Sequence, residues 1–141
     1  MRVELSDEAR RLVALFEDEA GVTVRDCVVD EDHEQVVYMV KRGQMADAIG
    51  PGGQTVERVE EAIGRDVKLV EAAETPEDFV ANALAPAAVY NVTVSENGDT
   101  VAYVEVAQAD RGAAIGRDGR NIDAARKLAK RHFDIVDIEL T

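Results

Sequence analysis

The segment Ile49-Gly50-Pro51-Gly52-Gly53-Gln54-Thr55-Val56 decides the fold, because it recurs 66 residues later as Ile115-Gly116-Arg117-Asp118-Gly119-Arg120-Asn121-Ile122. An isoleucine, two glycines and a branched aliphatic residue fall in register in the two copies. One Gly-x-x-Gly pattern alone indicates little, since glycines flank many turns between helices. A repeat is more informative, because internal self-similarity indicates two copies of one structural unit.

The residues around the first copy predict a small mixed fold. Ser6 is a favourable N-cap, and apolar residues follow it at helical spacing as far as Gly21, where the helix is expected to end. Stretches rich in β-branched residues predict strands, and the glycine turn is expected between two helices. The predicted order is a helix up to residue 20, strands at 22–29 and 35–41, helices at 43–49 and 54–64, and a strand at 67–72.

The residues around the second copy predict the same order again. Thr75-Pro76-Glu77-Asp78 starts a helix with an N-cap, Pro at the first helical position and acid in the first turn. Asn97-Gly98 lies between two β-branched stretches and is a strong hairpin signal. The predicted elements after this helix are strands at 87–95 and 100–107, helices at 109–115 and 120–131, and a strand at 133–140.

Each half is therefore expected to be an α+β layer, with helices packed on one face of a three-stranded sheet. The boundary falls near Glu74, which gives domains of residues 1–73 and 74–141. No Gly/Ser-rich linker separates them, so we expect the two halves to pack rigidly.

A turn with glycine at both ends suits close approach of another molecule to the backbone. The glycines permit positive φ and carry no Cβ. The helix that follows begins with N–H groups at the positive end of its dipole, and these attract phosphate. The two turns therefore predict places where a sugar–phosphate backbone can lie.

Together, the two Ile-Gly-x-x-Gly-x-x-[Val/Ile] turns and the repeated element order resemble KH domains of the type II order. In that order a helix and a strand precede the strand–helix–turn–helix–strand core. The type I order would need two strands and a terminal helix after the turn, whereas only one strand fits before Thr75. The resemblance implies two tandem type II KH domains that clamp four nucleotides of single-stranded nucleic acid at each turn.

Two such domains that fill a short acidic chain resemble the archaeal NusA-type transcription factors, over essentially all 141 residues. That resemblance implies binding of single-stranded RNA in transcription termination, antitermination or elongation control. Bacterial relatives add a polymerase-binding N-terminal domain and an S1 domain. Neither fits in this length, so contact with RNA polymerase or the elongation complex stays open.

Basic residues gather around the second turn. Residues 108–133 hold seven basic and three acidic residues, a net charge of +4, whereas residues 41–68 hold five of each sign. Arg117 and Arg120 lie in and beside the turn, where phosphate would arrive. The residues predicted to bind RNA are Ile49, Gly50, Pro51, Gly52, Gly53 and Gln54 with Lys41 and Arg42 in the first half, and Ile115, Gly116, Arg117, Asp118, Gly119 and Arg120 with Arg111 and Lys127 in the second.

The first turn departs from the usual KH pattern, which commonly has a basic residue between the glycines. Pro51 and Gly52 carry no charge, and Pro51 has no N–H. Nearby cations are opposed by the acidic residues Glu57, Glu60 and Glu61. We therefore predict that the first domain binds RNA more weakly and extends a path set by the second.

The composition indicates a salt-adapted protein. The net charge is −13, from 14 Asp and 15 Glu against 12 Arg and only 4 Lys, and the acid is spread along the chain. Diffuse acid with little Lys resembles the proteins of halophilic archaea, and we expect stability to rise with salt. Cys27 is the only cysteine, so it is expected to be a buried, inert thiol without a disulfide.

The remaining expectations concern the class of protein. No nucleophile–base pair, Walker loop, metal-ligand spacing or dinucleotide fingerprint is present, so we expect no enzyme activity, cofactor or metal. No stretch approaches the length of a membrane span, and we expect a cytoplasmic monomer. The alternative function is a KH-fold protein-interaction module, associated with ribosome or polymerase, with little RNA binding of its own.

Overall fold

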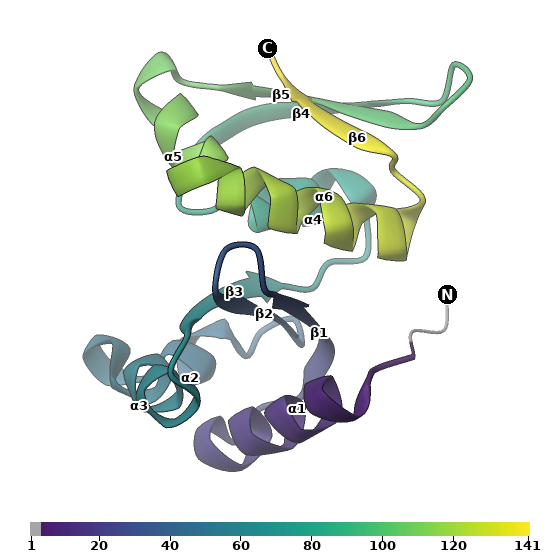
Figure 1. Cartoon of the computed structure of the whole chain (residues 1–141). Helices are drawn as coiled ribbons and strands as arrows, with labels where there is room; N and C mark the ends of the chain where they lie inside the picture. Colours follow the sequence, from purple (N-terminus) through teal and green to yellow (C-terminus); the bar gives the residue numbers. More distant parts are fainter. Residues whose placement is uncertain (1–3) are drawn as a thin grey trace. The chain divides into compact units, whose positions relative to one another are not determined.

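The computed structural model describes residues 4–141, so the first three residues of the predicted domain 1–73 lie outside the described range. The chain divides into two compact units, one that ends at Ala72 and one that begins at Ala73. Each unit has its own sheet of three strands, with its helices on one face (Figure 1). None of the helices in residues 4–141 is long and apolar enough to cross a membrane.

The first unit has the predicted order of elements. They are α1 (Asp7–Ala20), β1 (Val24–Asp30), β2 (Gln35–Val40), α2 (Met45–Ile49), α3 (Gln54–Ile63) and β3 (Asp66–Glu71). The sheet order is β1-β2-β3, with an antiparallel β1–β2 pair and a parallel β2–β3 pair. The parallel pair requires a crossover, which α2 and α3 provide.

The core of the first unit forms where α1 packs on the sheet. Phe16 and Tyr38 are fully buried, with ring centroids 4.4 Å apart. Ser6 caps α1 as predicted, since its hydroxyl accepts the Ala9 N–H at 3.1 Å. Cys27 is buried, as predicted.

The second unit repeats this order. Its elements are α4 (Pro76–Ala83), β4 (Val89–Ser95), β5 (Val101–Val106), α5 (Arg111–Ile115), α6 (Arg120–Phe133) and β6 (Asp137–Leu140). The sheet order is β4-β5-β6, again with an antiparallel pair followed by a parallel pair. The predicted α+β fold, with the α-β-β-α-α-β order of a type II KH domain in each half, is therefore observed.

One predicted boundary is wrong. The last strand was expected to begin at Phe133, but α6 continues through that residue and β6 begins at Asp137. The Phe133 ring lies 5.3 Å from the Phe79 ring of α4, which explains why the helix keeps this residue. The helix ends at Asp134, which takes the left-handed conformation with φ 55°. The other element boundaries agree with the prediction to within two residues.

Candidate nucleic-acid interface

Each unit contains a glycine corner between two helices, and the two corners have nearly the same backbone. The first corner is Gly50–Gly53, between α2 and α3, and the second corner is Gly116–Gly119, between α5 and α6. Gly50 and Gly116 both have ψ 169°, with φ 78° and 79°. Gly53 and Gly119 have φ 81° and 79°, with ψ near 10° and 8°. The repeated sequence therefore produces a repeated local structure.

The third residue of each corner also has positive φ, although the residue type differs. Gly52 has φ 61° in the first corner, and Asp118 has φ 56° in the second. Asp and Asn tolerate this left-handed region better than other side chains. The corner therefore accepts either a glycine or a short acidic residue at this position.

The first glycine of each corner is required by close packing. A Cβ on Gly116 would lie 2.7 Å from Asn121 Cβ and 2.8 Å from Asn121 N. A Cβ on Gly50 would lie 2.7 Å from Thr55 Cβ. These separations are far below van der Waals contact, so only glycine lets the turn close onto the helix that follows.

The second glycine is the N-cap of the following helix, α3 or α6. Glycine has no side chain that could accept the N–H groups of the first helical turn, as a Ser or Asp N-cap would. These N–H groups lie at the positive end of the helix dipole. An anion at the corner can therefore accept hydrogen bonds from backbone nitrogens.

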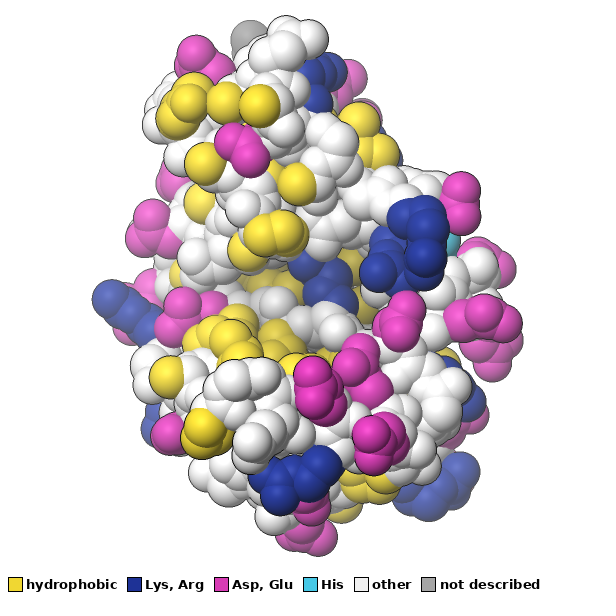
Figure 2. Space-filling view, turned by 90° about the vertical axis from the view of Figure 1, so that its left-hand side faces the viewer, with side chains coloured by type: hydrophobic (Ala, Val, Ile, Leu, Met, Phe, Trp, Pro, Cys, Tyr) yellow, Lys and Arg dark blue, Asp and Glu magenta, His cyan; other side chains and the backbone are white. Residues whose placement is uncertain are grey.

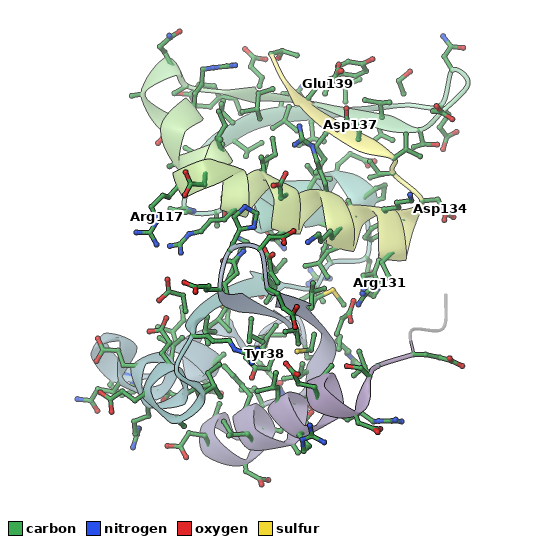
Figure 3. All side chains as sticks on the ribbon, viewed as in Figure 1. Tyr38, Arg117, Arg131, Asp134, Asp137 and Glu139 are labelled. Atoms are coloured by element: carbon green, nitrogen blue, oxygen red, sulfur yellow. The ribbon has the colours of Figure 1, made fainter. Side chains whose placement is uncertain are left out.

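The surface around both corners is open and partly apolar. Ile49 and Ile115, which directly precede the corners, are 40% and 38% exposed although isoleucine is usually buried. Arg117 is exposed and projects away from the ribbon of the second corner (Figure 3). On the face drawn in Figure 2, hydrophobic side chains lie beside Lys and Arg at several places on the surface. This mixture suits a ligand with a charged backbone and flat apolar bases.

The predicted residues of the first unit fall into two groups. Pro51, Gly52 and Gln54 are exposed at the corner itself. Lys41 and Arg42 are exposed in the turn that follows β2. Arg58, the one basic residue of α3, is directed away from this role because it forms an ion pair with Glu19 of α1 at 3.4 Å.

The predicted residues of the second unit differ in what surrounds them. Lys127 is exposed on α6, and Arg120 is half-buried at the start of that helix. Arg111 donates a hydrogen bond to the Thr141 carbonyl at 3.3 Å. Arg126 is one of the seven basic residues of 108–133, but its Nε forms an ion pair with the Asp137 carboxylate at 2.9 Å. Part of the positive charge predicted around this corner is therefore neutralised within the unit.

Two buried polar residues behind the corners are not predicted from the sequence pattern. Thr55 and Asn121 occupy the same position of the repeat, and they are 6% and 8% exposed. Each is the residue against which the first glycine of its corner packs. Both copies of the repeat have a polar residue at this position, next to the predicted core face of the helix. That pattern is the one sequence feature that could have indicated their role.

Comparison with known proteins places these corners in a family. A model of the KH domain matches residues 10–74, and a model of the NusA-like second KH domain matches residues 76–141. The probable transcription termination protein NusA of Halococcus morrhuae is 61% identical over 140 residues, which is 99% of each chain. This chain belongs to the NusA family.

Other NusA proteins and one solved structure support the assignment. The probable NusA of Halobacterium salinarum is 60% identical over the whole of both chains. NusA of Mycobacterium bovis is 38% identical over 88 residues, which is 62% of this chain and 25% of that protein. The crystal structure of APE1850 matches 97% of this chain and all of that chain, with a TM-score of 0.83 and 30% identity. The predicted family and fold class are confirmed. The relatives from Halococcus and Halobacterium come from halophilic archaea.

Proposed function

We propose that this chain is a NusA-type transcription factor that binds single-stranded RNA at its two glycine corners. The observation that carries the proposal is the repeated corner, which presents backbone nitrogens at the start of a helix beside an exposed isoleucine. KH domains clamp four nucleotides of single-stranded nucleic acid at such a loop. The names of the relatives support a role in transcription termination.

In this proposal the RNA backbone lies against the corner and the bases face the apolar surface beside it. Phosphate oxygens accept hydrogen bonds from backbone N–H groups at the start of α6, and Arg117 and Arg120 add positive charge. At about 1 M salt the screening length is about 3 Å, so hydrogen bonds and apolar contacts matter more than long-range attraction. Ile49 and Ile115 are therefore expected to contribute to affinity as much as the arginines.

The proposal makes the two corners unequal. Arg117 supplies a cation and a backbone N–H to the second corner, whereas the equivalent Pro51 supplies neither. The second corner is therefore the main RNA site, and the first extends the path. The proposed domains are residues 1–73 and 74–141, supported by the division of the chain after Ala72 and by the matched ranges of the two family models.

The remaining parts of the proposal concern partners. We infer a cytoplasmic monomer without catalytic activity, and light scattering of the purified chain tests the monomer. Contact with RNA polymerase is a separate proposal that rests on the names of the relatives. A pull-down with purified polymerase, with and without RNA, tests it.

A pair of charge-matched variants tests the RNA function. Arg117→Asp places Asp-Asp between the glycines of the second corner, and Pro51→Asp with Gly52→Asp does the same in the first. Both variants change the net charge by −2, and Asp118 shows that the third position accepts Asp. We expect fluorescence anisotropy with an unstructured RNA to show at least about tenfold weaker binding for Arg117→Asp, and a smaller loss for the other variant.

Either of two results would contradict the proposal. An unmodified chain that binds no unstructured RNA would remove the RNA function and favour the protein-interaction module. A larger loss in the first corner than in the second would reverse the proposed ranking.

A further inference from the structure

Asn121 is a buried polar side chain at the point where three segments of the second unit meet. It is the second residue of α6 and is 8% exposed. Its side-chain nitrogen, Nδ2, lies 3.2 Å and 3.3 Å from the carbonyl oxygens of Leu84 and Ala85. It also lies 3.2 Å and 3.1 Å from the carbonyl oxygens of Ala113 and Ala114.

These four carbonyls belong to the ends of two helices. Leu84 is the C-cap of α4 and Ala85 follows it, while Ala113 and Ala114 are in the last turn of α5. The last carbonyls of a helix have no partner within the helix. The Leu84 carbonyl accepts the Ala87 N–H at 3.1 Å as well as the Asn121 amide. The Asn121 amide has two hydrogens and can donate to one carbonyl of each helix at the same time. It therefore ties the start of α6 to the ends of α4 and α5.

The second corner is in direct contact with Asn121. The backbone of Gly116 packs so closely on Asn121 that a Cβ at Gly116 would lie 2.7 Å from Asn121 Cβ. The corner is closed by two backbone bonds, from Gly116 N to the Gly112 carbonyl at 2.8 Å and from Gly119 N to the Gly116 carbonyl at 3.1 Å. Any shift of Asn121 is therefore transmitted to the turn that presents its N–H groups.

The first unit uses a different residue at the same position. Thr55 is buried behind Gly50, but a hydroxyl has one hydrogen and cannot donate to two carbonyls at once. The two corners therefore share their backbone conformation and differ in the side chain that supports it.

We propose that Asn121 is the positioning residue of the second corner. It holds the backbone of Gly116–Gly119 in the conformation that binds RNA, without touching RNA itself. The corner therefore loses less conformational entropy when RNA binds. The inference rests on the proposed RNA function and extends it, because it adds a second reason, besides Arg117, for the second corner to bind more tightly than the first.

The test compares Asn121→Thr with three other variants of the full chain. Asn121→Thr introduces the residue that the first unit has at this position, and Asn121→Asp keeps the shape of the side chain while removing both amide hydrogens. Leu128→Ala is the control for lost stability, since Leu128 is a fully buried core residue two turns further along α6. Arg117→Ala is the control for a lost phosphate contact.

Three quantities are measured at a temperature where circular dichroism shows every variant folded. We expect about tenfold weaker binding of an unstructured RNA for Asn121→Thr, from the loss of one or two buried hydrogen bonds, and little change for Leu128→Ala. Hydrogen exchange at the Gly116 and Gly119 amides is expected to accelerate more in Asn121→Thr than in Leu128→Ala. The slope of log affinity against log salt should stay as in the unmodified chain for Asn121→Thr and fall by about one for Arg117→Ala.

Each outcome bears on the proposal separately from the RNA function. Unchanged exchange at Gly116 and Gly119 in both Asn121 variants would overturn the positioning role, whatever the RNA result. Faster exchange with unchanged RNA affinity would show that corner order does not set affinity, and would overturn it too. A salt slope that falls in Asn121→Thr as it does in Arg117→Ala would show that the substitution removes an ionic phosphate contact, and would contradict a role limited to the order of the corner. Failure of the unmodified chain to bind RNA would instead remove the proposed function.

Discussion

At the scale of single residues, the two glycines of each corner have different physical roles. Gly116 is required because no space exists for a Cβ between it and Asn121. A Cβ on Gly119 would lie 3.6 Å from an Asp123 carboxylate oxygen, which is ordinary contact. The left-handed φ of Gly119 is therefore the main reason for glycine at this position. The sequence pattern alone treats the two glycines as equivalent, whereas the structure separates them.

This difference predicts unequal costs for alanine. Gly116→Ala should lower the free energy of unfolding by about 3 kcal/mol or more, because it combines backbone strain with a clash that the helix cannot relieve. Gly119→Ala should cost about 1 kcal/mol, from the left-handed conformation alone. Denaturant unfolding of the two variants measures both values. Equal losses would contradict the packing argument.

The sequence was sufficient to predict the corner residues but not the side chains that support them. Gly-x-x-Gly repeats are visible in one chain because glycine has a distinctive conformational role. Asn121 is part of the repeated segment, yet its role depends on carbonyls of Leu84 and Ala85, more than 30 residues earlier in the chain. Contacts of this kind are set by tertiary packing and leave no local pattern.

At the scale of helices and strands, Tyr38 links the sheet of the first unit to its first helix. The Tyr38 hydroxyl on β2 donates to the Leu12 carbonyl of α1 at 3.0 Å. Burial raises the pKa of this hydroxyl well above its usual value, and the nearby Cys27 raises it further. The hydroxyl therefore stays protonated and keeps its donor role in the folded chain.

The raised pKa predicts a loss of stability at alkaline pH. An unfolded Tyr releases its proton near pH 10, while the folded Tyr38 holds its proton at higher pH. Its contribution to stability is therefore complete below about pH 10 and is lost as pH rises further toward the folded pKa. Tyr38→Phe should lower the free energy of unfolding by about 1 kcal/mol at neutral pH. It should also reduce the decline of that free energy between about pH 10 and 11. Urea unfolding at several pH values measures both effects, and an equal decline in both proteins would assign it to other groups.

Elements with strong local signals were predicted well, and the end of α6 was not. The caps at Ser6 and Thr75 and the hairpin at Asn97-Gly98 follow from side chains that bond their own backbone or favour one turn. The last turn of α6 is decided by the contact between Phe133 and Phe79 of α4. An aromatic residue before a β-branched pair favours a strand locally, and tertiary packing overrides that preference.

At the scale of the whole molecule, charge is the dominant feature. The chain carries −13, and repulsion among its carboxylates disfavours the compact state at low salt. Screening shortens from about 10 Å at 0.1 M to about 3 Å at 1 M salt. The relatives from halophilic archaea align with this chain over nearly its full length.

Stability is therefore expected to rise with salt. Between about 0.1 M and 1 M KCl, the melting temperature should increase by about 5 °C or more, equivalent to about 1 kcal/mol for domains of this size. Glu96→Gln with Asp99→Asn, two exposed residues of the β4–β5 turn, should reduce the increase because it removes two negative charges. A melting curve that is indifferent to salt would contradict the electrostatic account.

The most direct test of the account is a titration of the 15N-labelled chain with an unstructured single-stranded RNA, followed by NMR. The account predicts that backbone amide shifts are largest at residues 116–120, with smaller shifts at residues 50–54. Shifts that spare both glycine corners and concentrate on the β4–β5–β6 sheet would contradict the claim that RNA binds at these corners.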